Sequence, residues 1–219
     1  MNTETRTEAT VNWPAFFQRA QFHITVNERA GLPPEGLAEV AFAGRSNAGK
    51  STAINVLTQR NRLAFTSKTP GRTQHINYFG LGEEGFLVDL PGYGYAEVPK
   101  AVKLHWQKLL ADYMATRHSL AGLVVLMDIR HPLTLLDQQL LEWFLPRQKP
   151  VIILLTKADK LGRGGRLETA RQVRQALVDS GVPLSVIPFS SHSREGVEQA
   201  QEEIGRLFRP SGTEITVGI

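Results

Sequence analysis

Short apolar runs alternate with longer amphipathic stretches along most of this chain. The runs are rich in Val, Ile, Leu and Phe and are bounded by Gly, Pro or polar residues, which is typical of β-strands. Alternation of such runs with helical stretches predicts an α/β fold with a mainly parallel sheet. We predict strands over residues 39–43, 73–81, 85–89, 123–128, 150–156 and 185–190.

Two of these runs are apolar at every position and not at every second one. Residues 123–127 read LVVLM and residues 151–155 read VIILL. Strands of this kind are buried on both sides, so we expect helices on both faces of the sheet. The runs 73–81 and 85–89 are separated by Gly82-Glu-Glu, which is too short for a crossover helix. They should form a hairpin, which gives a six-stranded sheet one antiparallel edge strand.

Between the strands, apolar residues recur every three or four positions, which predicts amphipathic helices. Within the longest of them, Trp106 and Tyr113 lie on the apolar stripe, and we expect both to pack in the core. The predicted helices cover residues 50–58, 100–117, 133–145, 166–180 and 197–208.

The length of 219 residues fits one domain with short additions. We assign residues 37–209 to this domain, residues 1–36 to an N-terminal appendage, and residues 210–219 to a C-terminal tail. No apolar run approaches the roughly 20 residues of a membrane-spanning helix, and the first residues lack the basic and apolar regions of a secretion signal. Cysteine is absent, which excludes disulfides and thiolate metal sites, and we expect a cytoplasmic protein without a membrane partner.

The net charge of +4 is compatible with an anionic partner such as RNA, and the more common explanation is the ordinary solubility of a small domain. Basic residues cluster in the last third of the chain, where an rRNA contact competes with a solvated helix face. The solvated face is the more common explanation, since no aromatic residue is interleaved with them. These residues are Lys157, Lys160, Arg163, Arg166, Arg171 and Arg174.

The strongest motif is GRSNAGKS at residues 44–51, which fits G-x-x-x-x-G-K-[ST] between a predicted strand and a predicted helix. In such a loop, backbone N–H groups surround phosphate oxygens, Lys50 contacts the β- and γ-phosphates, and the Ser51 hydroxyl binds Mg²⁺. The motif therefore predicts a nucleotide site with Mg²⁺ as its metal. The contacting residues are Gly44, Arg45, Ser46, Asn47, Ala48, Gly49, Lys50, Ser51 and Thr52.

A second candidate for the phosphate side is Asp89-Leu-Pro-Gly92, which ends the third predicted strand. Asp89 would hold Mg²⁺ through a water, and the Gly92 N–H would contact the γ-phosphate. A plain Pro-Gly turn after a strand is the alternative for this segment taken alone.

The base is indicated by Thr156-Lys157-Ala158-Asp159, which follows the fifth predicted strand and resembles the N/T-K-x-D motif of GTPases. The Asp159 carboxylate can accept hydrogen bonds from guanine N1–H and the N2 amino group, whereas adenine presents an acceptor at N1 and no N2 amino group. Discrimination of this kind reaches about 10⁴, because the wrong base leaves the carboxylate unpaired. Lys157 would lie along the guanine ring and brace the GRSNAGKS loop, which is the P-loop of this chain.

The ordered set resembles the P-loop GTPase (G domain) fold and, within the Era, EngA and septin-like group, the EngB family, also called YihA or YsxC. The resemblance covers residues 38–208 and rests on GRSNAGKST, KTPGRTQHINYF, VDLPGYGYA, DIRHPLTLLD, TKADK and FSS. It implies a switch that binds GTP and GDP and hydrolyses GTP. It also implies a role in assembly of the large ribosomal subunit, with rRNA and ribosomal proteins as partners, and a link to cell division and septation.

The resemblance also assigns roles to residues that their own pattern leaves open. Thr73 becomes a metal ligand, chosen over Thr66 and Thr69 because it directly precedes the second predicted strand, and Gly71 and Arg72 line the nucleotide beside it. The backbone N–H groups of two further residues would meet the guanine O6. These are Ser190 and Ser191.

Catalysis is expected to be slow. Ras-type enzymes place a water-orienting glutamine after D-x-x-G, whereas this chain has Tyr93, which lacks a carboxamide. The catalytic set that remains is Lys50, Thr73, Gly92 and Asn47. Asn47 matches the asparagine that coordinates K⁺ in potassium-activated relatives, and its alternative role is to stabilise the loop through its own backbone. Either K⁺ or a partner would then stimulate hydrolysis.

Two other function classes stay open. In the first, the protein is an RNA- or ribosome-binding module in which GTP is an allosteric ligand and hydrolysis is incidental. In the second, it is a P-loop metabolite kinase, which the guanine motif and the absence of an Arg-rich lid disfavour. No apolar stripe is left over once the core is assigned, so we expect a monomer.

Overall fold

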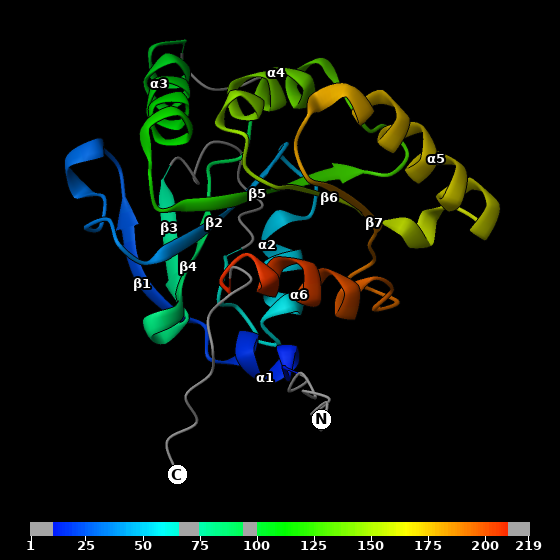
Figure 1. Cartoon of the computed structure of the whole chain (residues 1–219), viewed down its shortest axis with the longest axis horizontal. Coiled ribbons are helices and arrows are strands. Elements are labelled where there is room, and N and C mark those ends of the chain that lie inside the picture. The colour runs from blue at the N-terminus through cyan, green and yellow to red at the C-terminus, as the bar shows by residue number, and fades with distance from the viewer. Residues whose placement is uncertain (1–10, 66–74, 94–99, 210–219) are drawn as a thin grey trace, which may run out of the picture.

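The computed structural model describes residues 11–65, 75–93 and 100–209, and the side chains of residues 100–107 lie outside the description. The described residues form a seven-stranded sheet with helices on both faces (Figure 1). The strands are β1 (Gln21–Val26), β2 (Ala38–Gly44), β3 (Ile76–Gly80), β4 (Gly85–Asp89), β5 (Leu120–Asp128), β6 (Val151–Thr156) and β7 (Leu184–Pro188). The α-helices are α1 (Trp13–Gln18), α2 (Lys50–Leu57), α3 (Lys100–Thr116), α4 (Leu135–Phe144), α5 (Arg163–Ala176) and α6 (Val197–Arg206).

The strand order is β1-β3-β4-β2-β5-β6-β7. Strand β2 pairs in parallel with β4 and with β5, and the parallel pairing continues through β6 to β7. Strand β3 is antiparallel to both of its neighbours, β1 and β4, and is the reversed strand among those described. The predicted α/β class with a mainly parallel sheet is confirmed.

The predicted number of six strands is too low by one, because β1 joins the sheet beside β3. The sheet thus extends into residues 1–36, and the reversed strand β3 is not the edge. Five of the six β1 residues are exposed, so no continuous apolar run marks this strand. Its signal in the sequence is the alternation of Phe22, Ile24 and Val26 with polar residues.

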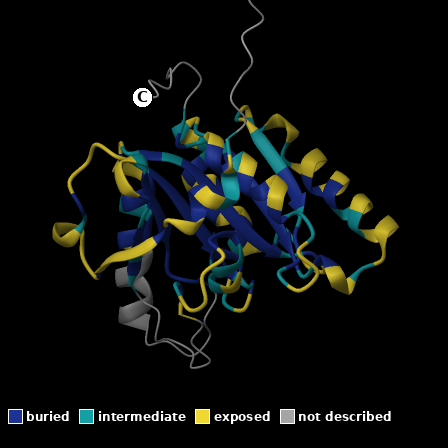
Figure 2. Cartoon of the chain, turned by 90° about the horizontal axis from the view of Figure 1, so that it is seen from below, coloured by how far each residue is buried: buried dark blue, intermediate teal, exposed yellow. Residues whose placement is uncertain are grey.

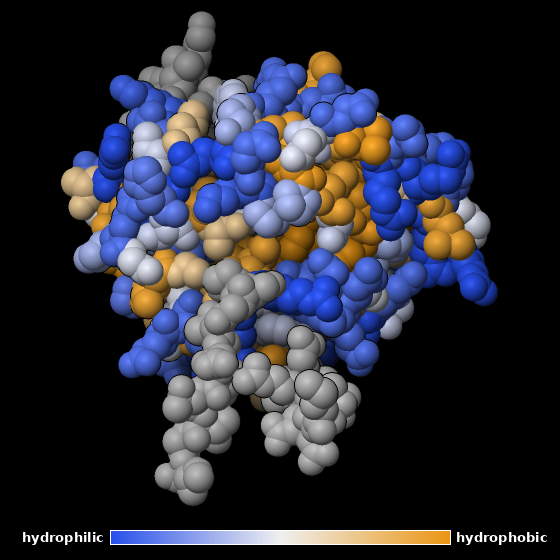
Figure 3. Space-filling view, viewed as in Figure 1, coloured by the Kyte–Doolittle hydropathy of each residue, from blue (hydrophilic) through white to orange (hydrophobic). Residues whose placement is uncertain are grey.

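The helices lie in two layers, with α3, α4 and α5 on one face of the sheet and α1, α2 and α6 on the other (Figure 1). Along β2, Ala41 and Ala43 pack into the first core, and Val40 and Phe42 pack into the second. Burial on both sides explains why the central runs are apolar at every position. Figure 2 shows the strands buried between helices whose outer faces are exposed. Figure 3 shows hydrophobic residues where the strands lie, with hydrophilic residues on the helices above and below them.

The largest error in helix position concerns α5, which begins at Arg163 and ends at Ala176 instead of covering residues 166–180. Two of the residues before the predicted start are Gly164 and Gly165, and glycine is a poor helix former. In the structure both lie in the first turn of the helix. No helix within the described ranges is long and apolar enough to cross a membrane.

A buried ion pair closes the end of the sheet where β2 begins, which is opposite to the GRSNAGKS loop. The Glu39 carboxylate is 1% exposed and the Arg117 side chain is 6% exposed. Arg117 donates to Glu39 Oε1 from Nε at 2.9 Å and from Nη2 at 2.5 Å. The hydroxyls of Tyr113 and Tyr78 donate to Glu39 Oε2 at 2.7 and 3.3 Å, and Arg117 Nη2 also donates to the Pro33 carbonyl. Tyr113 is buried as predicted, and its hydroxyl is part of this network.

We expect Arg117→Met to lower the free energy of unfolding by about 3–5 kcal/mol, because Glu39 would stay buried without its counter-charge. Urea denaturation measures this change. The control is Arg206→Met, which breaks the exposed pair of Arg206 with Glu202 and should cost about 1 kcal/mol or less. Similar losses in the two variants would contradict a special role for the buried pair.

Candidate nucleotide site

Polar residues gather where the parallel strands end at their carboxyl side. Gly44 ends β2, Asp89 ends β4, Asp128 ends β5 and Thr156 ends β6. Because these strands are parallel neighbours, their carboxyl ends meet at one edge of the sheet. Both faces of the sheet are filled by apolar packing, so this edge is where the chain can place a polar site.

The GRSNAGKS loop leaves this edge and leads into α2, which begins at Lys50. Gly44 packs closely on β5, where a Cβ would lie 3.0 Å from the Leu126 carbonyl oxygen. Asn47 and Gly49 have φ angles of 64° and 86°, in the left-handed region. Glycine and asparagine adopt this conformation most readily. The predicted strand-loop-helix setting of the motif is therefore confirmed.

Lys50 and Asp89 form an ion pair between the loop and the end of β4. Their side chains are 8% and 2% exposed, so the pair is almost fully shielded from solvent. Ser51 follows in the first turn of α2 and is half-buried, whereas Thr52 is exposed. A hydroxyl and a carboxylate are oxygen donors of the type that Mg²⁺ prefers, together with phosphate oxygens and water. The donor set thus fits Mg²⁺, although the described residues contain no cluster of three or more His, Cys, Asp or Glu side chains.

The Asp89–Gly92 segment is fastened to the loop by its next residue, Tyr93. The Tyr93 N–H donates to the Gly44 carbonyl at 3.3 Å, and the Ser46 N–H donates to the Tyr93 carbonyl at 2.8 Å. The Tyr93 hydroxyl is buried and donates to Asp137 Oδ1 at 2.7 Å. Burial and the Asp137 carboxylate raise the pKa of Tyr93 far above its ordinary value, so the hydroxyl stays protonated. This side chain is anchored against α4 and is not available to orient a water.

The segments predicted to read the base meet at the ends of β6 and β7. The Ser190 hydroxyl donates to Asp159 Oδ1 at 2.7 Å. This hydrogen bond is the main reason that the pKa of Asp159 lies below its usual value, so the carboxylate is ionised. Ser190 Oγ also accepts the N–H groups of His192 and Ser193, which fixes its position. Sequence reasoning assigned Ser190 only a backbone role and missed that its side chain orients Asp159.

The backbone N–H of Ser190 donates to the Glu195 carbonyl at 3.0 Å, so it does not face a ligand. Ser191, the second residue expected in this role, is half-buried.

The P-loop is braced by Thr156 and not by Lys157 as we expected. Thr156 Oγ1 lies 2.7 Å from the Ala48 carbonyl oxygen, to which it donates. Lys157 has a left-handed backbone with φ 58°, and its Nζ lies 2.9 Å from Asp128 Oδ2. Lys157 and the P-loop do line a common hollow of about 150 Å³.

Asp128 is a site residue that the sequence reasoning missed. Arg130 donates to both of its oxygens, at 2.9 and 2.6 Å, and with Lys157 holds the pKa of Asp128 well below its usual value. Its position at the end of β5, which corresponds to that of Asp89 in β4, was the available signal. The ionised Asp128 keeps Lys157 beside the base-reading segment.

Three predicted site residues cannot be compared with this geometry, because they lie outside the described residues. They are Gly71, Arg72 and Thr73. All of the remaining predicted residues lie along the same sheet edge, at the ends of β2, β4 and β6, in the loops after these strands and β7, or in the first turn of α2.

The family model described as a 50S ribosome-binding GTPase matches residues 39–157. The chain is 56% identical over 195 residues to a protein of Methylobacillus flagellatus named "Probable GTP-binding protein EngB", and the alignment covers 89% of this chain and 94% of that protein.

Solved structures share the fold. The crystal structure of a probable GTP-binding protein EngB aligns with a TM-score of 0.62 at 23% identity, over 78% of this chain and 99% of that one. Era in complex with MgGDPNP and a segment of 16S ribosomal RNA aligns with a TM-score of 0.61 at 17% identity, over 83% of this chain and 60% of that one. Together with the strand-end loops described above, the sequence matches show that this chain belongs to the EngB family of GTP-binding proteins and has the P-loop GTPase fold.

Proposed function

We propose that this protein binds GTP and GDP at the carboxyl edge of its sheet and hydrolyses GTP as a switch in assembly of the large ribosomal subunit. The observation that carries the nucleotide site is the meeting of the Lys50–Asp89 pair and the Asp159–Ser190 pair at that edge. The ribosomal role is supported by the name of the matching family, and Era shows that a protein of this fold can bind ribosomal RNA.

On the phosphate side, the Ser46 and Ala48 N–H groups are bonded within the protein, and other backbone N–H groups of residues 44–52 would surround the phosphates. The Lys50 ammonium would neutralise β- and γ-oxygens. Ser51, Thr73 and Asp89 would hold Mg²⁺. When bound, this ion spreads the negative charge that develops on the phosphate oxygens. The Gly92 N–H would contact the γ-phosphate, and we propose that residues 66–73 and 89–95 respond to its loss.

On the base side, Asp159 accepts hydrogen bonds from guanine N1–H and N2. The hydrogen bond from Ser190 fixes the direction of the Asp159 carboxylate, whose second oxygen lies 3.3 Å from Lys160 Nζ. We assign the contact with guanine O6 to the N–H of Ser191.

Hydrolysis by the isolated protein is expected to be slow because the Tyr93 hydroxyl is held by Asp137 and orients no water. Faster hydrolysis would need an additional positive charge at the phosphates, and two sources of this charge are compatible with the site. One is K⁺ held by Asn47, which is exposed in the loop, and the other is a group from the ribosomal partner.

We further propose that the protein acts as a monomer in the cytoplasm and that its ribosomal role underlies a link to cell division and septation. The alternative is a GTP-regulated RNA-binding module in which hydrolysis is incidental. A variant that binds GTP but does not hydrolyse it separates the two functions.

Asp159→Asn should weaken GTP and GDP binding by about a hundredfold or more, because the amide N–H₂ would face the donors of guanine. The same change should favour xanthine nucleotides, whose C2 carbonyl accepts a hydrogen bond. Titration with fluorescent GTP, GDP, XTP and ATP analogues measures both effects.

The matched control is Asp179→Asn, an exposed carboxylate before the amino end of β7, opposite to the edge that carries the site, which should leave the affinities unchanged. Ser190→Ala should weaken GTP by about tenfold, as expected for one lost hydrogen bond to a charged group. Equal binding of ATP and GTP by the unmodified protein would overturn the guanine assignment.

Thr73→Ala should bind GTP but hydrolyse it at least about tenfold more slowly, since a metal ligand is lost. If GTP hydrolysis triggers release of the protein from its ribosomal precursor, this variant accumulates on large-subunit precursors in sucrose gradients and fails to support growth. The control is Thr66→Ala, which should behave like the unmodified protein. Normal growth with blocked hydrolysis would favour the binding-module alternative.

Replacing Na⁺ by K⁺ at equal ionic strength should raise the GTPase rate severalfold. The Asn47→Ala variant should show the same rate in both salts, because the side-chain ligand of K⁺ is missing. Phosphate release under single-turnover conditions measures the rates. Equal rates of the unmodified protein in the two salts would remove K⁺ from the mechanism and leave the partner as activator.

A further inference from the structure

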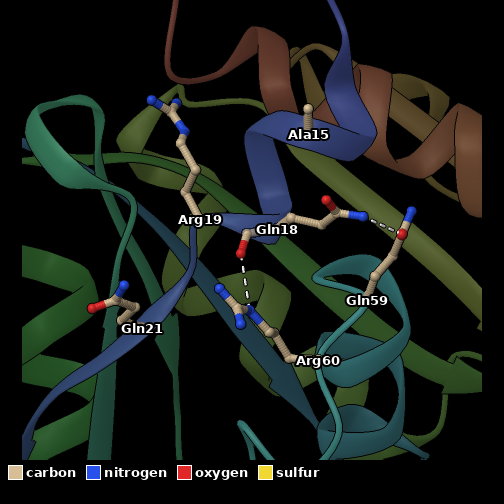
Figure 4. Close-up of a pocket in the computed structure, with 6 residues that line it drawn as sticks. All are labelled: Ala15, Gln18, Arg19, Gln21, Gln59 and Arg60. Atoms are coloured by element: carbon tan, nitrogen blue, oxygen red, sulfur yellow. Dashed lines mark hydrogen bonds between the residues drawn. The ribbon is translucent and has the colours of Figure 1, made fainter.

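An open hollow of about 480 Å³ lies away from the nucleotide site, between α1, the start of β1 and the end of α2. Its lining residues carry positive charges and amides and include no carboxylate (Figure 4). They are Ala15, Gln18, Arg19, Gln21, Gln59 and Arg60. A lining of this composition is suited to an anionic ligand with additional hydrogen-bonding groups.

The hollow is held together by hydrogen bonds between its walls. Arg60 Nε donates to the Gln18 carbonyl at 2.9 Å, and Gln18 Nε2 donates to Gln59 Oε1 at 2.5 Å (Figure 4). These bonds tie the residues after α2 to the end of α1. Arg60 forms no ion pair with a carboxylate of the described chain, so the charge of its guanidinium is directed to solvent.

Arg19 on the opposite wall is half exposed. Its Nη2 lies 3.7 Å from Glu84 Oε1, and the same oxygen accepts a hydrogen bond from Arg209 at 3.0 Å. The Glu84 carboxylate thus faces the guanidinium groups of both Arg19 and Arg209. Since Arg60 adds a third positive charge, the net charge of this group of residues is positive. The ordinary attraction of such a surface is to phosphate groups.

An exposed aromatic ring lies on the same face of the sheet. Phe22 of β1 is 58% exposed, and its ring packs edge-on against Phe79 at 6.5 Å. Phe79 belongs to the core formed with α1 and α2, which places Phe22 on the side of the hollow. An exposed ring on the same face as guanidinium groups offers a surface on which a nucleic-acid base can stack.

The basic residues that the sequence singled out near α5 offer a poorer surface for phosphates. Arg171 is paired with Glu168, and Arg166 is paired with Glu195. Arg174 donates to the Val186 carbonyl at 2.9 Å. The charges of Arg166 and Arg171 are therefore neutralised by carboxylates, whereas Arg60, like Arg174, donates to a backbone carbonyl.

We infer that the hollow and Phe22 form a docking surface for single-stranded RNA. Arg19 and Arg60 bind backbone phosphates, the amides of Gln21 and Gln59 hydrogen-bond sugar or base edges, and a base stacks on Phe22. The choice of RNA rests on the proposed ribosomal function.

The test is binding of a fluorescein-labelled oligouridylate of about 12 nucleotides, followed by anisotropy at several KCl concentrations with GDP present. We expect Arg19→Gln/Arg60→Gln to weaken binding about tenfold or more and to reduce the salt slope by about 0.7 for each lost phosphate contact. Phe22→Ala should weaken binding about fivefold or more and leave the salt slope unchanged.

Arg171→Gln is the matched control and should bind like the unmodified protein. Unchanged GDP affinity shows that each variant is folded, and Arg60→Lys should retain the salt slope because the charge remains. Equal affinity of the double variant and the unmodified protein would overturn the inference, as would binding of duplex RNA alone. Cosedimentation with large-subunit precursors without oligouridylate binding would remove this surface and leave the proposed function in place. Oligouridylate binding without cosedimentation would remove the ribosomal function and leave the RNA surface.

Discussion

The burial of a mainly parallel sheet between two helix layers is the constraint on which the rest of this structure depends. Residues of β2 pack alternately into the two cores, so neither face has room for charged groups. Polar chemistry is then confined to the strand ends, where helices and loops begin. Lys50 meets Asp89 at one of these ends, and Glu39 meets Arg117 at the other. The first pair lies in the nucleotide site, and the second holds α3 to the sheet.

The nucleotide site is built by shared contacts between loops. The Tyr93 backbone joins the P-loop to the end of β4, and the Thr156 hydroxyl joins the P-loop to the end of β6. Asp159 is directed by Ser190 from the following strand. The groups that we propose for phosphate binding and for base recognition are thereby held in fixed positions relative to one another, although they are more than a hundred residues apart in the chain.

Much of the fold and of the site follows from the sequence, because the relevant signals are local. The runs at 123–127 and 151–155 require burial on both sides, and GRSNAGKS requires a strand before it and a helix after it. The features that were missed depend on contacts between distant residues. Strand β1 is stabilised by pairing with β3, and no apolar run reveals it. The roles of Asp128 and of the Ser190 hydroxyl depend on side-chain directions that no motif spacing specifies.

Strand β1 also decides how the sheet ends. A free strand edge presents unpaired N–H and C=O groups to other chains and is a template for aggregation. The pairing of β1 with β3 shifts register between Phe22 and Ile24. Such a bulge twists the strand and interrupts the regular row of hydrogen-bonding groups. This irregular outer strand protects the sheet against edge-to-edge pairing with other chains. Strand β1 therefore also helps to keep the protein in solution.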